Sequence, residues 1–127
     1  MKLQVFDSKM SGKLKPGKLA VRINFNVGHF TFVKSACAAM NLKPGEQMKV
    51  GYNQDTQEWF LWKDNQDGFT LRLTKEDGNI MFNNVATADA IRRNLNLTDD
   101  SALFQIGSEP TEEDGIEYWA LLTPPIK

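Results

Sequence analysis

The sequence has little of the chemistry that enzymes and metal sites use. It holds one cysteine and one histidine among 127 residues, which excludes an internal disulfide and disfavours a zinc site built from several Cys and His ligands. Neither Cys37 nor His29 has a partner in the sequence that would complete a set of nucleophile, base and orienting group. No glycine-rich phosphate loop and no HExxH or CxxC motif is present. We therefore expect a protein that is not an enzyme, with no catalytic residues, no metal and no cofactor.

Long hydrophobic runs are also missing. No stretch approaches the roughly 20 apolar residues of a membrane span. Lys2 is not followed by the apolar run of about 7–15 residues that marks a secretory signal. Hydrophobic residues nevertheless make up 41% of the chain, enough for one domain with a buried core. These features predict a cytoplasmic protein with no membrane partner.

The net charge of −1 conceals an uneven distribution of charge along the chain. Residues 1–63 contain 10 basic and 4 acidic residues, whereas residues 64–127 contain 5 basic and 12 acidic residues. The first part therefore carries +6 and the second −7. The lysine-bearing residues 1–17 are typical either of an arm that follows a DNA backbone or of a solubilising linker. The basic half keeps nucleic acid open as a partner, and the acidic half favours a protein.

The sequence contains an internal repeat. A shift of 50 residues aligns residues 19–38 with residues 69–88. Identical residues meet at Arg22 and Arg72, Gly28 and Gly78, Phe32 and Phe82, Ala36 and Ala86, and Ala38 and Ala88. Farther along the shift grows, so that Asn41-Leu42 corresponds to Asn96-Leu97 and Trp59 to Trp119. Repeats of this kind fix the architecture before any local structure is considered.

Each copy of the repeat predicts the order strand, strand, helix, strand, strand. Alternating apolar residues indicate the strands, and an apolar stripe at i, i+3, i+4 and i+7 indicates each helix. The predicted strands cover residues 19–25, 29–32, 48–52 and 58–63 in the first copy, and 69–73, 79–82, 102–106 and 116–123 in the second. The predicted helices cover residues 33–40 and 84–95, with Cys37 on the apolar stripe of the first. Residues 53–57 and 107–115 are expected to be the loops of two hairpins, which pair residues 48–52 with 58–63 and residues 102–106 with 116–123. The acidic run 108–117 is expected to be solvated.

The first copy resembles a known family. Residues Gly28-His29-Phe30-Thr31-Phe32-Val33-Lys34 are followed by Leu42-Lys43-Pro44-Gly45-Glu46 and the apolar Met48 and Val50. This spacing resembles the AbrB/MazE/MraZ-like swapped-hairpin domain of the SpoVT-AbrB type, over residues 19–63 and more loosely over 69–123. His29 stands at the family's usual arginine position and Val33 at its usual proline position. In that family two halves interleave into one small barrel that usually binds DNA.

The repeat and the resemblance together predict one globular domain. We expect a β-rich α+β fold in which two tandem strand-strand-helix-strand-strand repeats form a single-chain pseudo-dimeric barrel of the swapped-hairpin kind. The basic arm covers residues 1–17, the first half 18–63, a linker 64–67 and the second half 68–123.

The resemblance makes double-stranded DNA the first candidate partner, in the manner of a transcriptional regulator. Arg22 and Arg72 are predicted at equivalent places on the outward face of two strands, where arginine forks could contact phosphates. The open alternative is a solvated strand face with cross-strand ion pairs. The full set of candidate DNA-binding residues is Lys18, Arg22, His29, Lys34, Arg72, Arg92 and Arg93.

The aromatic run Glu58-Trp59-Phe60-Leu61-Trp62 supports a second function class. Its counterpart around Trp119 and Leu121 predicts that Trp59 and Leu61 belong to the core. Phe60 and Trp62 point to the other face of the strand and are the candidate interface residues. The alternative to DNA binding is therefore a protein-interaction or assembly module, such as a phage or mobile-element accessory protein, that meets a protein partner or a second copy through aromatic and acidic surfaces.

Overall fold

A computed structural model describes residues 18–74 and 78–126, and the predicted arm 1–17 lies outside this range. The described residues form ten strands and two helices. The first half contains β1 (Ala20–Asn24), β2 (His29–Phe32), α2 (Lys34–Ala39), β3 (Gln47–Asn53) and β4 (Glu58–Lys63). The second contains β5 (Phe69–Thr70), β6 (Arg72–Leu73), β7 (Ile80–Asn83), α3 (Val85–Asn94), β8 (Ser101–Gln105), β9 (Thr111–Glu113) and β10 (Ile116–Leu121).

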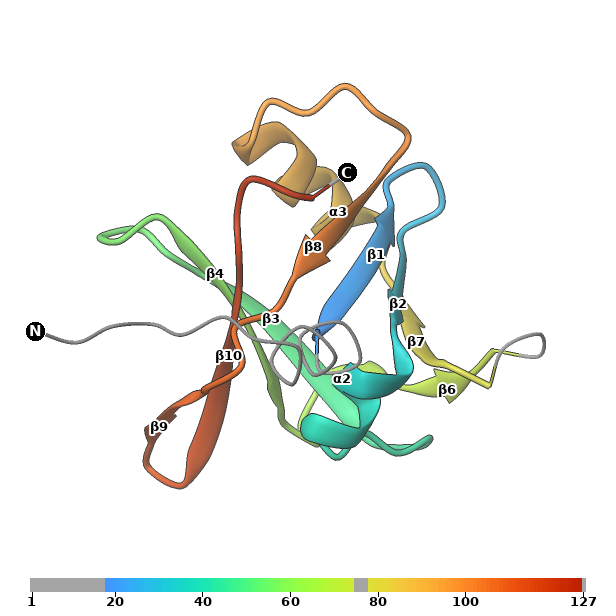
Figure 1. Ribbon diagram of the computed structural model, residues 1–127, viewed down its shortest axis with the longest axis vertical. Helices are drawn as coiled ribbons and strands as arrows, with labels where there is room; N and C mark the ends of the chain where they lie inside the picture. The colour runs from blue at the N-terminus through green and yellow to red at the C-terminus, as the bar shows by residue number, and fades with distance from the viewer. Residues whose placement is uncertain (1–17, 75–77, 127) are drawn as a thin grey trace, which may run out of the picture.

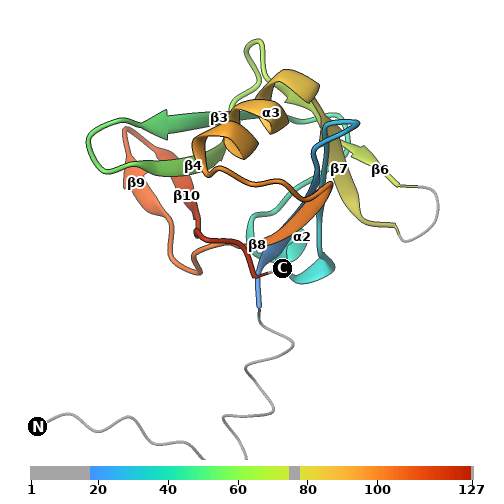
Figure 2. The ribbon, with the colours of Figure 1, turned by 90° about the horizontal axis from the view of Figure 1, so that it is seen from above.

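The strands form two antiparallel sheets of five strands each. Sheet A has the order β6-β7-β2-β1-β8, and sheet B has the order β5-β3-β4-β10-β9. The two sheets lie on opposite sides of the molecule, with α2 near one end and α3 near the other (Figures 1 and 2). The β-rich α+β class predicted from the sequence is confirmed. Each half contributes strands to both sheets.

Hydrogen bonds pass from one sheet to the other on both sides. Leu71 separates β5 from β6, and its N–H donates to the Glu46 carbonyl at 2.8 Å, so one extended segment crosses from sheet B to sheet A. On the other side Ile106, just after β8, bridges to Leu121 of β10, and the Gly107 N–H donates to the Ala120 carbonyl at 2.9 Å. The sheets are therefore tied together along two seams.

Several strand registers of the two halves correspond, with a shift of 50 residues for β1, β2, β6 and β7 and of 60 residues for β4 and β10. Arg22 of β1 pairs with Thr31 of β2, and 50 residues on Arg72 of β6 pairs with Met81 of β7. The β2–β7 pairing is centred on Thr31 and Met81, with Phe30 opposite Phe82 and Phe32 opposite Ile80 on either side. The β4–β10 pairing is centred in the same way on Phe60 and Ala120. In both pairings the central residue of one strand is aligned in the repeat with the central residue of the other. Each pairing is therefore symmetric between the two halves.

The helix ends repeat the same geometry. Asn41 and Asn96 follow α2 and α3 with φ of 54° and 57°, the left-handed conformation that asparagine tolerates. The next N–H in each case donates back five residues, from Leu42 to the Cys37 carbonyl at 2.9 Å and from Leu97 to the Arg92 carbonyl at 3.0 Å. The alignment of Asn41-Leu42 with Asn96-Leu97 thus corresponds to one shared helix cap.

One strand was missing from the sequence prediction. Residues 107–115 were expected to be the loop of a hairpin between residues 102–106 and 116–123. That pairing was wrong: β8 pairs with β1 in sheet A, and only Ile106, just after it, bridges to Leu121 of β10. Within the expected loop Thr111–Glu113 form β9, which pairs with Ile116–Tyr118 of β10. The turn between them uses Asp114 (φ 52°) and Gly115 (φ 79°). All three residues of β9 are exposed, so the strand has no apolar alternation by which the sequence could reveal it.

The core lies between the two sheets. Phe82 stacks on Phe30 with ring centroids 4.5 Å apart and on Phe69 at 5.2 Å, so the central ring cluster draws on both halves. Trp59 and Trp119 are buried, as predicted. The helices complete the core with Ala36 from α2 and with Ala88 and Ile91 from α3.

Two equivalent glycines offer a matched test of this packing. Gly28 and Gly78 have nearly the same φ, +73° and +69°, but a Cβ on Gly28 would lie 2.5 Å from the Val85 nitrogen, whereas one on Gly78 would meet nothing within 4 Å. Gly78→Ala should cost about 1–2 kcal/mol for the left-handed conformation alone. Gly28→Ala should cost about 1–3 kcal/mol more, because the start of α3 must move. Urea unfolding of both variants measures the difference, and equal losses of stability would contradict this account.

Candidate functional site

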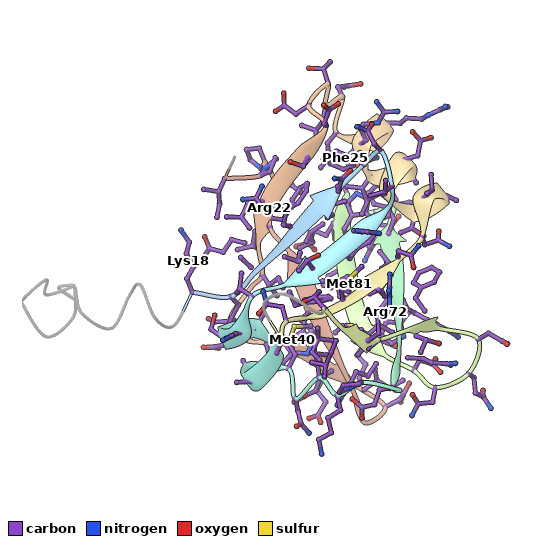
Figure 3. All side chains as sticks on the ribbon, turned by 90° about the vertical axis from the view of Figure 1, so that its right-hand side faces the viewer. Lys18, Arg22, Phe25, Met40, Arg72 and Met81 are labelled. Atoms are coloured by element: carbon purple, nitrogen blue, oxygen red, sulfur yellow. The ribbon has the colours of Figure 1, made fainter. Side chains whose placement is uncertain are left out.

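Arg22 and Arg72 lie in one row on the outer face of sheet A. Val21 and Ile23 point into the core with no exposed surface, which turns Arg22 outward. The paired residues across the sheet run Leu103, Arg22, Thr31, Met81 and Arg72. The arginines belong to strands three places apart, so their Cα atoms are separated by roughly 14 Å. Both are exposed, and Figure 3 shows them with Met81 between them.

The strands of sheet A contain no acidic residue. Their charged or titratable side chains are Arg22, Arg72 and His29. The strands of sheet B instead carry Glu58, Glu112, Glu113 and Glu117 with Lys49 and Lys63. The strands of sheet A therefore carry positive charge and those of sheet B mostly negative charge. This division does not follow the two halves of the chain, because Arg72 of the acidic half lies in sheet A.

Three other predicted DNA-binding residues lie in the strands of sheet A or close to their ends in the chain. His29 is half-buried and pairs with Asn24 on one side and Asn83 on the other, two rows away from the arginines and on the same face of the sheet. Lys18 and Lys34 are exposed where the chain enters β1 and α2. The two segments are held together because the Ser35 hydroxyl donates to the Lys18 carbonyl.

Arg92 and Arg93 are placed differently from the other predicted residues. They lie on α3, and both guanidinium groups bind Asp89, with nitrogen to oxygen distances of 2.8 Å each. The hydrogen bond from Arg92, followed by the positive charge of Arg93, holds the pKa of the Asp89 carboxyl below its usual range. One carboxylate therefore balances part of their charge, and the structure does not bring them onto the strands of sheet A.

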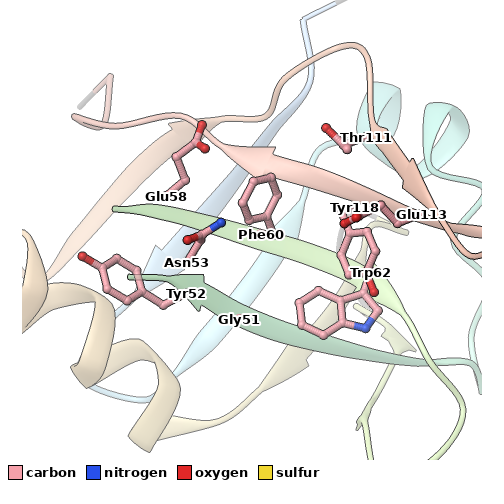
Figure 4. A pocket seen from close by; sticks show the side chains of 9 residues that line it. All are labelled: Gly51, Tyr52, Asn53, Glu58, Phe60, Trp62, Thr111, Glu113 and Tyr118. Atoms are coloured by element: carbon pink, nitrogen blue, oxygen red, sulfur yellow. The ribbon is translucent and has the colours of Figure 1, made fainter. Parts of the chain in front are cut away.

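The outer face of sheet B carries a groove of about 550 Å³, which we call the aromatic groove. Its lining residues are Gly51, Tyr52, Asn53, Glu58, Phe60, Trp62, Thr111, Glu113 and Tyr118 (Figure 4). Both predicted interface residues, Phe60 and Trp62, lie in it and are partly exposed. Tyr118 joins them from β10, with its ring centroid 5.0 Å from that of Trp62. The sequence prediction missed Tyr118, although its position next to the buried Trp119 places it on the opposite face of the strand.

Gly51 determines where the Trp62 ring lies. A Cβ at this position would be 2.7 Å from Cη2 and 2.9 Å from Cζ3 of Trp62. The absence of a side chain therefore lets the indole ring cross the β3 backbone. Glycine is otherwise unfavourable in a strand, so its use here serves this close approach.

The charges around the aromatic groove are acidic. Glu58 and Glu113 line it, and no lysine or arginine does. Lys49 lies nearby on β3, but its Nζ is 3.2 Å from Asp64. The pKa of the Asp64 carboxyl is lowered by the backbone N–H of Gln66 and then by Lys49. The ammonium group of Lys49 is therefore already paired.

The remaining titratable groups form no further site in the described range. Cys37 packs against the core, and burial raises the pKa of its thiol. Within residues 18–74 and 78–126 no three His, Cys, Asp or Glu side chains come close enough together to hold a metal ion. None of the described helices is long and apolar enough to cross a membrane.

Comparisons with protein-family models, with curated proteins and with solved structures found no match for this chain.

The contact between Gly51 and Trp62 predicts a spectroscopic effect. Gly51→Ala should displace the indole ring toward solvent and shift part of the tryptophan emission to longer wavelength, with little loss of stability because only the far end of one side chain has to move. Trp59 and Trp119 are buried and should not respond. The matched control is Gly51→Ala in a Trp62→Phe background, where the emission should stay constant. A shift that persists in that background would contradict the assignment.

Proposed function

We propose that this is a non-enzymatic DNA-binding protein that contacts duplex DNA through the outer face of sheet A. The observation that carries the proposal is the row containing Arg22 and Arg72 on a sheet whose strands hold no carboxylate. Phosphate contacts supply most of the sequence-independent affinity for DNA, and arginine binds phosphate oxygens in pairs. The strands of this sheet add no carboxylate of their own that would repel a phosphate.

The spacing of the two arginines suits the duplex. Their Cα atoms lie roughly 14 Å apart, and the major groove of B-DNA is about 12 Å wide. Flexible side chains on either side of the Thr31–Met81 pair can therefore contact phosphates of both strands. Lys18 and Lys34, exposed at the start of β1 and α2, would add contacts at one end of this face.

We further infer that the fold is a tandem repeat of the swapped-hairpin kind, in which two halves of one chain take the place of two chains. The symmetric registers of β2–β7 and β4–β10 and the shared asparagine caps support this inference. The duplication would make Arg22 and Arg72 equivalent residues of the two halves. A two-fold pair of arginines suits the approximate two-fold symmetry of a DNA backbone.

Fluorescence anisotropy tests the DNA proposal. It measures the affinity of the protein for a fluorescein-labelled 20-base-pair duplex of mixed sequence at salt concentrations between 50 and 200 mM. The logarithm of the association constant should fall linearly with the logarithm of salt concentration. Arg22→Ala/Arg72→Ala should weaken binding about tenfold or more at 50 mM salt and reduce the slope by about 2, since each lost phosphate contact removes about 0.9.

The matched control for this test removes two positive charges from the other sheet. Lys49→Gln/Lys63→Gln alters β3 and β4 of sheet B, and circular dichroism checks that the fold survives the loss of their ion pairs. The control should bind DNA within about twofold of the wild-type protein. Equal weakening by both double variants, or no binding at 50 mM salt, would overturn the proposal.

The interleaved halves predict fragment complementation. A chain cut between Gln66 and Asp67 gives two fragments, each of which supplies strands to both sheets. Neither fragment should unfold cooperatively alone, because each lacks the partner strand for its central phenylalanines. An equimolar mixture should recover the circular dichroism spectrum and the cooperative urea transition of the intact protein. Cooperative unfolding of either fragment alone would count against the halves acting as two interleaved protomers.

A further inference from the structure

We propose that the aromatic groove on sheet B binds a lysine- or arginine-bearing segment of a protein partner. The groove is bounded by Glu58 at the start of β4 and by Glu113 at the end of β9 (Figure 4). The rings of Phe60, Trp62 and Tyr118 lie between these two carboxylates. An aromatic floor with a carboxylate at each end is a site for cations rather than for neutral or anionic groups.

The chemistry of recognition follows from the lining residues. A cation over the face of an aromatic ring gains about 0.5–1 kcal/mol at an exposed site, and tryptophan gives the strongest interaction. The carboxylates of Glu58 and Glu113 add charge-assisted hydrogen bonds to an ammonium or guanidinium group. No basic side chain of the lining competes for them, and Lys49 is occupied by Asp64.

The length of the groove favours an extended protein segment. Glu58, Phe60 and Trp62 are alternate residues of one strand, so each step along the groove measures about 7 Å. The hydroxyl groups of Thr111 and Tyr118 line the groove and can bind a peptide backbone. The amide nitrogen of Asn53 can do the same, whereas its amide oxygen accepts from the Asp55 and Thr56 N–H groups. An extended peptide has the same spacing between alternate side chains, so two basic residues can reach the two carboxylates.

Charge also argues against nucleic acid as the ligand of this groove. Exposed aromatic rings can stack on unpaired bases, but here the same surface carries two carboxylates that repel phosphates. The strands of sheet B hold four glutamates in total. The protein would thus meet DNA with one sheet and a basic protein segment with the other, and the second interaction does not depend on the first.

A pair of labelled peptides tests the proposal on the full-length protein. One peptide alternates lysine and threonine over eight residues, and the other alternates glutamate and threonine. Anisotropy at 50 mM salt should show saturable binding of the lysine peptide and none of the glutamate peptide. Glu58→Gln/Glu113→Gln should weaken lysine-peptide binding at least fivefold. The matched control, Glu109→Gln/Glu112→Gln, removes the same charge from residues outside the groove and should change binding less than twofold.

The aromatic contribution is tested separately. Trp62→Leu keeps an apolar side chain but removes the ring, and it should weaken the lysine peptide about threefold or more. An unchanged affinity would mean that charge alone attracts the peptide. This result would overturn the proposal that the peptide binds in the aromatic groove. Equal weakening by the two glutamate pairs would overturn it as well.

Three further measurements test for other ligands of the groove. Displacement of the lysine peptide by a neutral oligosaccharide would show that the groove binds sugars. Binding of oligo(dT) that Trp62→Leu abolishes would show that it binds single-stranded DNA, and either result would overturn the proposal. A dimer in light scattering that Glu58→Gln/Glu113→Gln dissolves would identify a second copy of this chain as the occupant, and would also overturn it. Arg22→Ala/Arg72→Ala should leave peptide binding unchanged, which separates this test from the DNA proposal.

Discussion

The pairing of β2 with β7 is the contact on which the rest of the structure depends. These two strands come from different halves of the chain, and they place Phe30 opposite Phe82 with their rings 4.5 Å apart. The first half, with four strands in roughly 45 residues, would bury too little apolar surface to be stable alone. It therefore becomes stable only by sharing its core with the second half. The pairing of strands that are distant in the sequence requires the closure of a long loop, which lowers the entropy of the chain. Because this entropy loss grows only slowly with loop length, it slows folding more than it reduces stability.

The same pairing determines which side chains share a surface. Once Thr31 lies opposite Met81, the hairpin registers place Arg22 and Arg72 in the same row and on the same side. The β4–β10 pairing has the corresponding effect on sheet B, because it aligns Tyr118 with the face that carries Phe60 and Trp62. Both candidate binding surfaces therefore arise from contacts between the halves, and neither exists in one half alone.

Local patterns in the sequence predicted the elements well. The bounds of β2 and β4 agree with the predicted strands, and both helices begin and end within one or two residues of their predicted bounds. These elements have strong local signals: alternation of apolar residues, a helical apolar stripe, and a glycine at the turn. The strand β9 has no such signal, because a strand exposed on both faces has no hydrophobic period. The passage of one segment between sheets at Leu71 was equally invisible, since it depends on a backbone partner at Glu46 that is distant in the sequence.

The candidate site could be predicted only in part, for a related physical reason. Periodicity gives the face of its own strand on which a side chain lies, so the outward direction of Arg22, Arg72, Phe60 and Trp62 could be anticipated. The register between strands decides which of these side chains become neighbours, and a shift of one residue would turn every side chain of a strand to the other face. Arg92 and Arg93 illustrate the limit, because the sequence counted them as basic surface and the fold gives them Asp89, three and four residues earlier on the same helix. Asp89 cancels one of their two positive charges. The charge that a basic residue adds to a surface therefore depends on its neighbours in the fold more than on the half of the chain from which it comes.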